Sequence, residues 1–185
     1  MKKCVLIVLL ALLSYSVSAQ RFTISTNFVD LANYGTLNLD AGYSLSQHCS
    51  VVGGFKYNPW DFSKDGEDVY NKLFAVFAGV RYWPWYTNSG LWFQAKGQYA
   101  DYTNTGTWRH ALDEGRAVGV GLAAGYTFML SPHFNVELGF GGWAGKLLEH
   151  NLYECSDCLR LRESESGPGG FVDFDNIAVS LIYIF

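Results

Sequence analysis

The chain has 185 residues, of which 49% are hydrophobic and 17% aromatic, and its formal net charge is −4. This is the length of one ordinary domain. The acidic balance disfavours nucleic acid and anionic lipid surfaces as partners, because both are negatively charged. So many aromatic residues, together with 20 glycines, are unusual for a soluble domain.

Residues 1–19 predict a signal peptide. Two lysines precede an apolar run at 5–13, and Val17-Ser18-Ala19 is a small-residue cleavage site. The apolar run is shorter than the roughly 20 residues that a membrane-spanning helix needs. We therefore expect export with cleavage, which leaves one domain at 20–185 with a formal charge of −6, since both lysines are removed.

The rest of the chain contains eight segments in which apolar and polar residues alternate, as in half-buried β-strands. Turn residues separate these segments, and no segment has enough consecutive apolar residues for a spanning helix. The predicted strands are 21–30, 36–45, 49–58, 72–83, 90–102, 116–129, 134–145 and 171–185.

The two faces of these strands differ in an unusual way. In the sixth strand, Val118, Val120 and Leu122 alternate with glycine and alanine. A soluble barrel or sandwich, such as a lipocalin, would instead carry hydrophilic residues opposite its apolar face. Small residues suit a narrow barrel interior, and the apolar residues then face lipid. The sequence predicts an all-β, eight-stranded antiparallel up-and-down transmembrane β-barrel, with the soluble barrel as the alternative.

The connections between strands alternate in length. The even-numbered connections, which lie at one end of the barrel, are short: 46–48, 84–89 and 130–133. The three long ones are 60–71, 103–115 and 146–170. Outer-membrane barrels have short periplasmic turns and longer extracellular loops. The asymmetry therefore predicts a location in the bacterial outer membrane, with the long loops outside.

Aromatic residues gather near the predicted strand ends. Tyr and Trp favour the membrane–water boundary, because they combine an apolar body with a polar tip. The predicted periplasmic belt is Trp83, Trp85, Trp92, Phe134, Tyr183 and Phe185, and the outer belt is Tyr57, Trp60, Tyr99, Tyr102 and Trp143. Scattered core aromatics could produce a similar pattern, so the belts only support the barrel prediction.

Five charged residues fall on the face predicted to line the lumen: Asp40, Lys56, Arg81, Lys96 and Glu137. Side chains just fill an eight-stranded barrel, and a lone buried charge is costly, so these groups should pair. We predict a contact between Lys96 and Glu137 across the small residues of the sixth strand. Arg81 should lie nearby, and Asp40 should lie near Lys56. A structural polar plug is the favoured interpretation, and a gated ion path is the alternative.

Cys155 and Cys158 lie in the last long loop, outside the cytosol, where thiols oxidise readily. A local disulfide is the leading prediction. A redox motif would need a thioredoxin-like βαβ context, which the surrounding sequence lacks. A zinc site would need two more ligands, and His150 is the only obvious one. Cys49 is left as an odd thiol.

The chain ends within an apolar strand. Leu181, Tyr183 and Phe185 share the face predicted to meet lipid. Chain termini are usually polar and frayed, whereas the last strand of a closed barrel must pair with the first. We predict that these three residues form a C-terminal signal for the machinery that inserts barrels into the outer membrane.

Several short motifs are familiar. They are Arg81-Tyr82-Trp83, the Gly-x-x-x-Gly-Tyr run of 121–126, Glu137-x-Gly139, the pair Cys155 and Cys158, and Leu181-Ile182-Tyr183. With these motifs the chain resembles a Bacteroidota-type family of small outer-membrane barrels, OmpA/OmpX-like in size, that is labelled only as a domain of unknown function. The resemblance covers essentially the whole mature chain. It implies a barrel and a location, and it supplies no activity.

The function predicted from the sequence is structural or interaction-mediating. A lipid-modifying enzyme would need a nucleophile beside a base. His48 and Ser50 lie at the short-turn end, away from the outer leaflet, whereas His110, Asp113 and Glu114 share a loop where such groups are usually solvated. No catalytic, cofactor or metal site is expected.

The expected partners are outer-membrane lipid and lipopolysaccharide, the insertion machinery, and a surface protein or an envelope assembly bound by the acidic outer loops. The chain is expected to be monomeric and not to bind nucleic acid. The alternatives are a lipid-modifying enzyme and a narrow channel.

Overall fold

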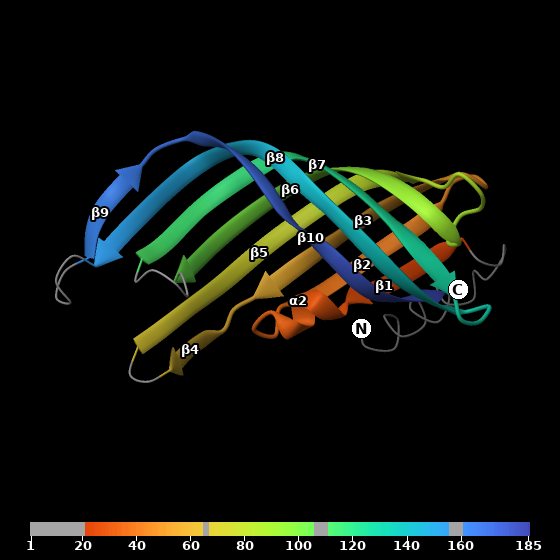
Figure 1. Cartoon of the computed structure of the whole chain (residues 1–185), viewed down its shortest axis with the longest axis horizontal. Helices are drawn as coiled ribbons and strands as arrows, with labels where there is room; N and C mark the ends of the chain where they lie inside the picture. Colours follow the sequence, from red (N-terminus) through yellow and green to blue (C-terminus); the bar gives the residue numbers. More distant parts are fainter. Residues whose placement is uncertain (1–20, 65–66, 106–110, 156–160) are drawn as a thin grey trace, which may run out of the picture.

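The computed structural model describes residues 21–64, 67–105, 111–155 and 161–185. Its elements are β1 (Phe22–Asn27), α2 (Phe28–Ala32), β2 (Leu37–Ser44), β3 (Cys49–Asn58), β4 (Asp61–Lys64), β5 (Glu67–Tyr82), β6 (Gly90–Thr105), β7 (Ala111–Met129), β8 (Phe134–Cys155), β9 (Leu161–Ser166) and β10 (Gly169–Ile184). Eight of the strands form a closed antiparallel barrel, and β4 and β9 extend two of its hairpins (Figure 1). The predicted eight-stranded barrel is confirmed. In the described part of the chain, no helix has the length and apolar character to cross a membrane.

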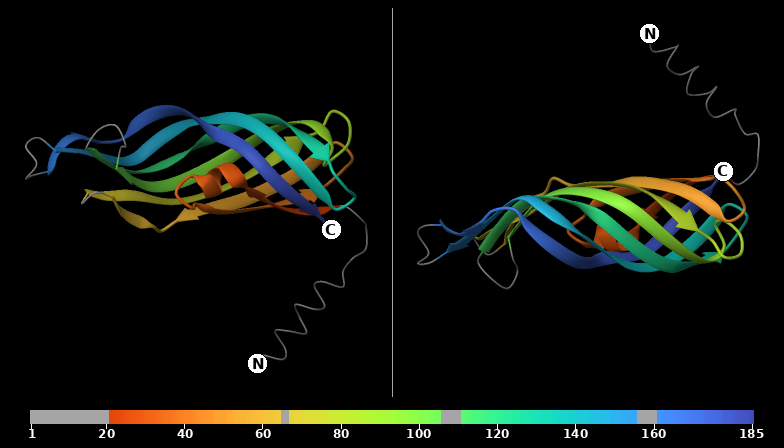
Figure 2. Two further views of the ribbon diagram at one scale, coloured as in Figure 1. Left: turned by 60° about the horizontal axis from the view of Figure 1, so that its bottom comes forward. Right: turned by 90° about the horizontal axis from the view of Figure 1, so that it is seen from above.

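The barrel closes between its last and first strands. β10 pairs with β1 from Ile184↔Thr23 to Ser180↔Asn27, and with β8 on its other side. Beyond the ladder, the backbone N–H of Phe185 donates to the carbonyl oxygen of Phe22 at 3.0 Å. The C-terminus therefore lies at the end that carries the short turns, which we call the turn end (Figure 2). The opposite end is called the hairpin end.

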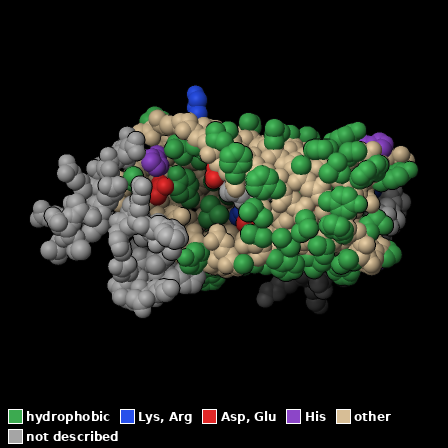
Figure 3. Space-filling model, in the orientation of Figure 1, with side chains coloured by type: hydrophobic (Ala, Val, Ile, Leu, Met, Phe, Trp, Pro, Cys, Tyr) green, Lys and Arg blue, Asp and Glu red, His purple; other side chains and the backbone are tan. Residues whose placement is uncertain are grey.

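The strand faces are inverted relative to a soluble barrel, as predicted. Val120 and Leu122 are each 72% exposed on the outside, whereas Asn135 and Glu137 are only 1% and 4% exposed inside. Figure 3 shows apolar side chains spread over most of the outer wall on the turn-end side. Period-two alternation thus produces an apolar exterior and a polar interior.

The prediction of a first strand at 21–30 is wrong, because β1 ends at Asn27 and α2 follows. The side chain of Asn27 accepts a hydrogen bond from the N–H of Val29 at 3.1 Å and so caps the helix. Asp30 lies in the first turn, where a carboxylate is favourable. An Asn followed three residues later by an acid is a helix-start pattern, and it prevails here over the strand alternation.

Because β1 and β2 end early, the barrel wall is incomplete on one side. Between Ser180 and the hairpin end of the barrel, β10 has a strand partner only in β8. Asn27 also satisfies the free edge of β10, since its side chain donates to the carbonyl of Ile177 and accepts from the N–H of Val179, both at 3.0 Å. Figure 2 shows α2 beside β10 at this low part of the wall.

The three long connections predicted as loops, 60–71, 103–115 and 146–170, are largely strand where they are described. β5 and β6 pair as far as Asn71↔Asn104, and β7 and β8 pair as far as Ala111↔Glu154. The backbone pairing continues in these segments, but they have no apolar outer face. The alternation of apolar and polar residues that predicts the strands nearer the turn end is therefore missing here. The hairpins extend well beyond the apolar wall.

Candidate functional site

The turn-end half of the lumen is filled by a hydrogen-bonded network, which we call the plug: Arg81, Gln94, Thr127 and Glu137. The guanidinium of Arg81 donates to Glu137 at 2.8 Å and, through Nε and Nη2, to the Gln94 carbonyl oxygen at 3.1 and 2.8 Å. The hydroxyl of Thr127 donates to the same Glu137 oxygen at 3.0 Å. The carboxylate is almost fully buried, so its charge is balanced by the ion pair and by these donors.

Two tryptophans complete the plug. The guanidinium of Arg81 lies 4.1 Å from the ring centroid of Trp92 and 5.7 Å from that of Trp83, within the range of cation–π attraction. The indole of Trp92 lies over Gly125 and Gly139, and a Cβ at Gly139 would be 2.9 Å from that ring. Glycine at these positions leaves the space that the indole occupies.

The prediction of two aromatic belts is wrong for four of its members. Trp83, Trp92 and Trp143 are buried inside the barrel, and Tyr102 faces the interior at the hairpin end. Each shares the period-two phase of an inward charged residue on its own strand, for example Trp92 with Lys96. The phase therefore predicts their direction better than their position near strand ends does.

The five charges predicted in the lumen surround one small space, together with Asp30 of α2. The volume left among them is about 60 Å³. Asp30 accepts from the ammonium group of Lys56 at 2.8 Å, a pairing that the strand alternation does not predict. Arg81 makes the 2.8 Å ion pair with Glu137, and the ammonium of Lys96 lies 4.9 Å from the ring centroid of Phe77. The predicted contact between Lys96 and Glu137 stays a prediction.

The hairpin-end half of the lumen contains a cavity of about 550 Å³. One part of its lining is apolar. Ala75, Ala100, Ala117 and Trp143 form a buried cluster, against which Leu73, Leu147 and Phe171 pack. The rings of Trp143 and Phe171 meet edge to face at 4.5 Å. This is the main apolar surface on the inside of the barrel in the described chain.

The other part of the lining is polar and lies nearer the hairpin end. His150 Nε2 lies 3.1 Å from Asp113 Oδ1, and the hydroxyl of Tyr102 donates to the Asp113 carboxylate. Gly115 pairs with both Tyr102 and His150 in the sheet, so its missing side chain leaves room for these larger groups. The sequence predicts a solvated loop position for Asp113; in the structure Asp113 faces the cavity.

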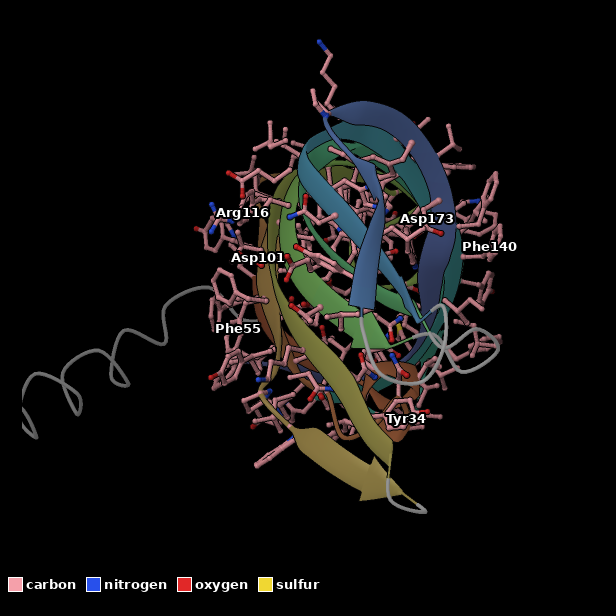
Figure 4. The ribbon with its side chains drawn as sticks, turned by 90° about the vertical axis from the view of Figure 1, so that its left-hand side faces the viewer. Tyr34, Phe55, Asp101, Arg116, Phe140 and Asp173 are labelled. Carbon is pink, nitrogen blue, oxygen red and sulfur yellow. The ribbon has the colours of Figure 1, made fainter. Side chains whose placement is uncertain are left out.

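On the outside of the barrel, a row of charged residues lies level with this polar part of the cavity. Arg116 lies 3.2 Å from Asp101 and 3.4 Å from Glu149 on the two neighbouring strands, and all three side chains are exposed. Seen from the hairpin end, Asp101 and Arg116 lie on the outer wall (Figure 4). The apolar exterior therefore ends at this row.

The cavity is open at its side as well as toward the hairpin end. Asp30 and Asn33, at α2, line it on one side, and Val172 and Asp173 of β10 line it on the other. These segments do not pair as strands. In the space-filling view the surface is hollowed at this place, and acidic side chains are visible inside (Figure 3).

Two turns at the turn end share one design, Leu-Ser-x-His, at 45–48 and 130–133. The carbonyl of His48 accepts from the N–H of Trp83 at 2.8 Å, and its Nδ1 lies 3.0 Å from the Trp83 carbonyl oxygen. His133 makes the same pair of contacts with Ile184, at 2.8 and 3.0 Å. We call these pairs the rim clamps.

The cysteines provide no test of the disulfide prediction. Cys158 lies outside the described residues, and Cys155 is the last residue of β8. Cys49, at the start of β3, is a free and exposed thiol. The predicted bridge between Cys155 and Cys158 stays a prediction.

One family model, described as "Protein of unknown function (DUF3575)", matches residues 5–185. No curated protein and no solved structure matches the chain. The match agrees with the resemblance to a family of unknown function, and it adds no activity or ligand.

Proposed function

We propose that this chain, which belongs to the DUF3575 family, spans the bacterial outer membrane as a plugged β-barrel and presents its extended hairpins to a surface partner or an envelope assembly. We group it with the small OmpA/OmpX-like barrels of the Bacteroidota type. In this proposal the barrel is an anchor, and the function lies in what the hairpins contact.

The observation that carries the proposal is the height of the apolar exterior. On β7 it extends from Val118 to Met129, directly below the charged row of Asp101, Arg116 and Glu149. Twelve residues of a strand tilted by about 45° cover roughly 28 Å, close to the hydrocarbon thickness of a bilayer. The fit supports a barrel that crosses one membrane.

Two further features favour an anchor over a passage. The plug leaves about 60 Å³ between its side chains, which holds at most a few water molecules. The hairpins of β5–β6 and β7–β8 continue beyond the charged row, and β4 and β9 widen them. Such extensions add nothing to a membrane span, whereas they enlarge the surface available for recognition.

Cysteine accessibility in intact cells tests the proposal. Glu149→Cys lies on a hairpin and Val120→Cys lies on the apolar wall, each in a chain whose Cys49, Cys155 and Cys158 are replaced by serine. We expect a membrane-impermeant maleimide to label position 149 and not position 120. Equal labelling at both positions, or a protein that fractionates as soluble, would contradict the membrane location.

The partner is tested at the same two positions. A photo-crosslinking residue at position 149 should give a discrete adduct in intact cells, and the same residue at position 120 should give only lipid adducts. If position 149 crosslinks to nothing but lipid or lipopolysaccharide, the hairpins have no protein partner under those conditions and the interaction function is rejected.

A further inference from the structure

We infer that the hairpin-end cavity binds an amphiphile with one acyl chain and an uncharged, hydroxylated head. The inference rests on the proposed function only for the source of the ligand, which would be the surrounding membrane. The binding itself follows from the lining of the cavity.

The apolar cluster provides the surface for the chain. Ala100, Ala117 and Leu147 are neighbours across three strands, and Trp143 and Phe171 close the cluster from the β8–β10 side. The cavity of about 550 Å³ lies within the roughly 300–1,000 Å³ of small-molecule sites. Leu73, Leu147 and Phe171 are only partly buried, so they present apolar surface that an apolar ligand would remove from water.

The polar group at the top of the cavity suits a hydroxylated head. Asp113 can accept from a ligand hydroxyl, and the Tyr102 oxygen can accept from another, because the single Tyr102 proton is already donated to Asp113. The charged groups that line the cavity largely offset one another, since Asp30, Asp113 and Asp173 lie with Lys56 and Lys72. Asp30 pairs with Lys56, and Asp113 lies against His150. A head with net charge would disturb one of these pairs, whereas an uncharged head leaves both intact.

The inside and the outside of the wall change character at the same height. Inside, the apolar row of Ala100, Ala117 and Leu147 gives way to a polar row. Tyr102 and Gly115 lie two residues further along β6 and β7, and His150 lies three residues further along β8, where a register shift adds one residue. The outward charged row lies between these two interior rows. A ligand bound with its chain below and its head above would therefore have the orientation and depth of a lipid in the outer leaflet.

The side opening gives a route that keeps the chain in an apolar environment. Val172 and Phe174 of β10 are exposed beside the opening. A bulge between Asp173 and Asn176 interrupts the pairing of β10 with β8 at this point. Bulges bend a strand and redirect its side chains, and they are frequent next to binding sites.

The experiment titrates monolaurin into the purified barrel held in amphipol and follows binding by calorimetry. Leu147→Trp and Leu148→Trp form a matched pair, because the first side chain faces the cavity and the second, its neighbour on β8, faces outward. We expect saturable binding of about one monolaurin per barrel in the wild type and in Leu148→Trp, and at least a tenfold weaker affinity in Leu147→Trp. Equal binding by all three proteins would overturn the inference.

Heat-modifiable gel mobility verifies that each variant is folded. If Leu147→Trp does not fold, Leu73→Trp brings bulk into the same cavity from β5, and unchanged binding by it would overturn the inference. Asp113→Asn should weaken monolaurin binding about tenfold by removing a charged acceptor. Tighter binding of lauric acid or dodecyltrimethylammonium than of monolaurin would overturn the assignment of the head. Because the assay needs no cell membrane, its failure leaves the cysteine topology test intact, and the reverse also holds.

Discussion

The two halves of the lumen are enclosed by the same long strands, yet one is full and the other is hollow. Around Arg81 and Glu137 all eight strands close the wall, and long side chains, facing glycines, leave about 60 Å³. Beyond α2, two strands are missing from the wall and the inward residues Ala75, Ala100 and Ala117 are small, which leaves about 550 Å³. The interior of a small barrel is thus determined locally, by strand length and inward side-chain size, and not by strand number alone.

Breaking the plug should have the largest effect on stability. Arg81→Met leaves the buried carboxylate of Glu137 without its cation, which should destabilise the fold by about 3–5 kcal/mol. Denaturant unfolding in detergent micelles or vesicles measures the change. The double variant Arg81→Met with Glu137→Leu should recover most of the loss. If the single variant is as stable as the wild type, the ion pair does not hold the turn-end half.

A lysine in the middle of the outer wall should have the next largest effect on stability. Val120→Lys places a charge in the middle of the apolar exterior and should destabilise a membrane-inserted barrel by about 2–4 kcal/mol. Leu148→Lys lies beside the outward charged row and should change the free energy of unfolding by less than about 1 kcal/mol. Unfolding in lipid vesicles measures both. Equal effects would mean that the apolar exterior does not face lipid.

Added bulk should have opposite consequences in the two halves. Gly125→Ala puts a methyl group against the indole of Trp92 and the carbonyl of Leu138, and should cost about 1–3 kcal/mol. Leu147→Phe extends into the open cavity and should change stability by no more than about 0.5 kcal/mol. Guanidinium unfolding of the two variants compares them directly. A larger loss for Leu147→Phe would contradict the contrast between a filled and a hollow half.

Only a small change in stability is expected at the C-terminus. Phe185→Asp keeps the backbone bond to Phe22 and adds a charge only near the proposed interface, where the cost is below about 1 kcal/mol. If Leu181, Tyr183 and Phe185 form an insertion signal, the amount of inserted barrel in cells should still fall severalfold. Phe185→Tyr is the conservative control. Normal insertion of Phe185→Asp would remove the signal role.

The sequence predicts the barrel wall well because one simple rule governs it. A residue's position in the period-two pattern decides whether it faces in or out, and this rule applies to Lys96 and Val120 alike. The same rule puts Trp92 inside the barrel, against the expectation of an interfacial belt. Asp30 was missed because a five-residue helix interrupts the pattern.

Pairing across the lumen was harder to predict. Arg81 and Glu137 lie on β5 and β8, and two strands separate them in the sheet. Which inward side chains meet depends on the stagger between strands and on how far each side chain reaches, and alternation contains neither. The strand character of the hairpin extensions is not predicted either. These segments pair through the backbone, and their sequence lacks the alternation of apolar and polar residues that indicates a strand.

The rim clamps have a consequence for the diameter of the barrel. A slip of two residues between neighbouring strands would keep every side chain on its correct face, so alternation alone does not prevent it. Such a slip would change the shear of the barrel, and with it the tilt of the strands and the width of the lumen. His48 and His133 each tie a turn to one specific residue of the next strand, Trp83 and Ile184. The two rim clamps thus help to fix the width of the lumen, and with it the space in which Arg81 and Glu137 form their ion pair.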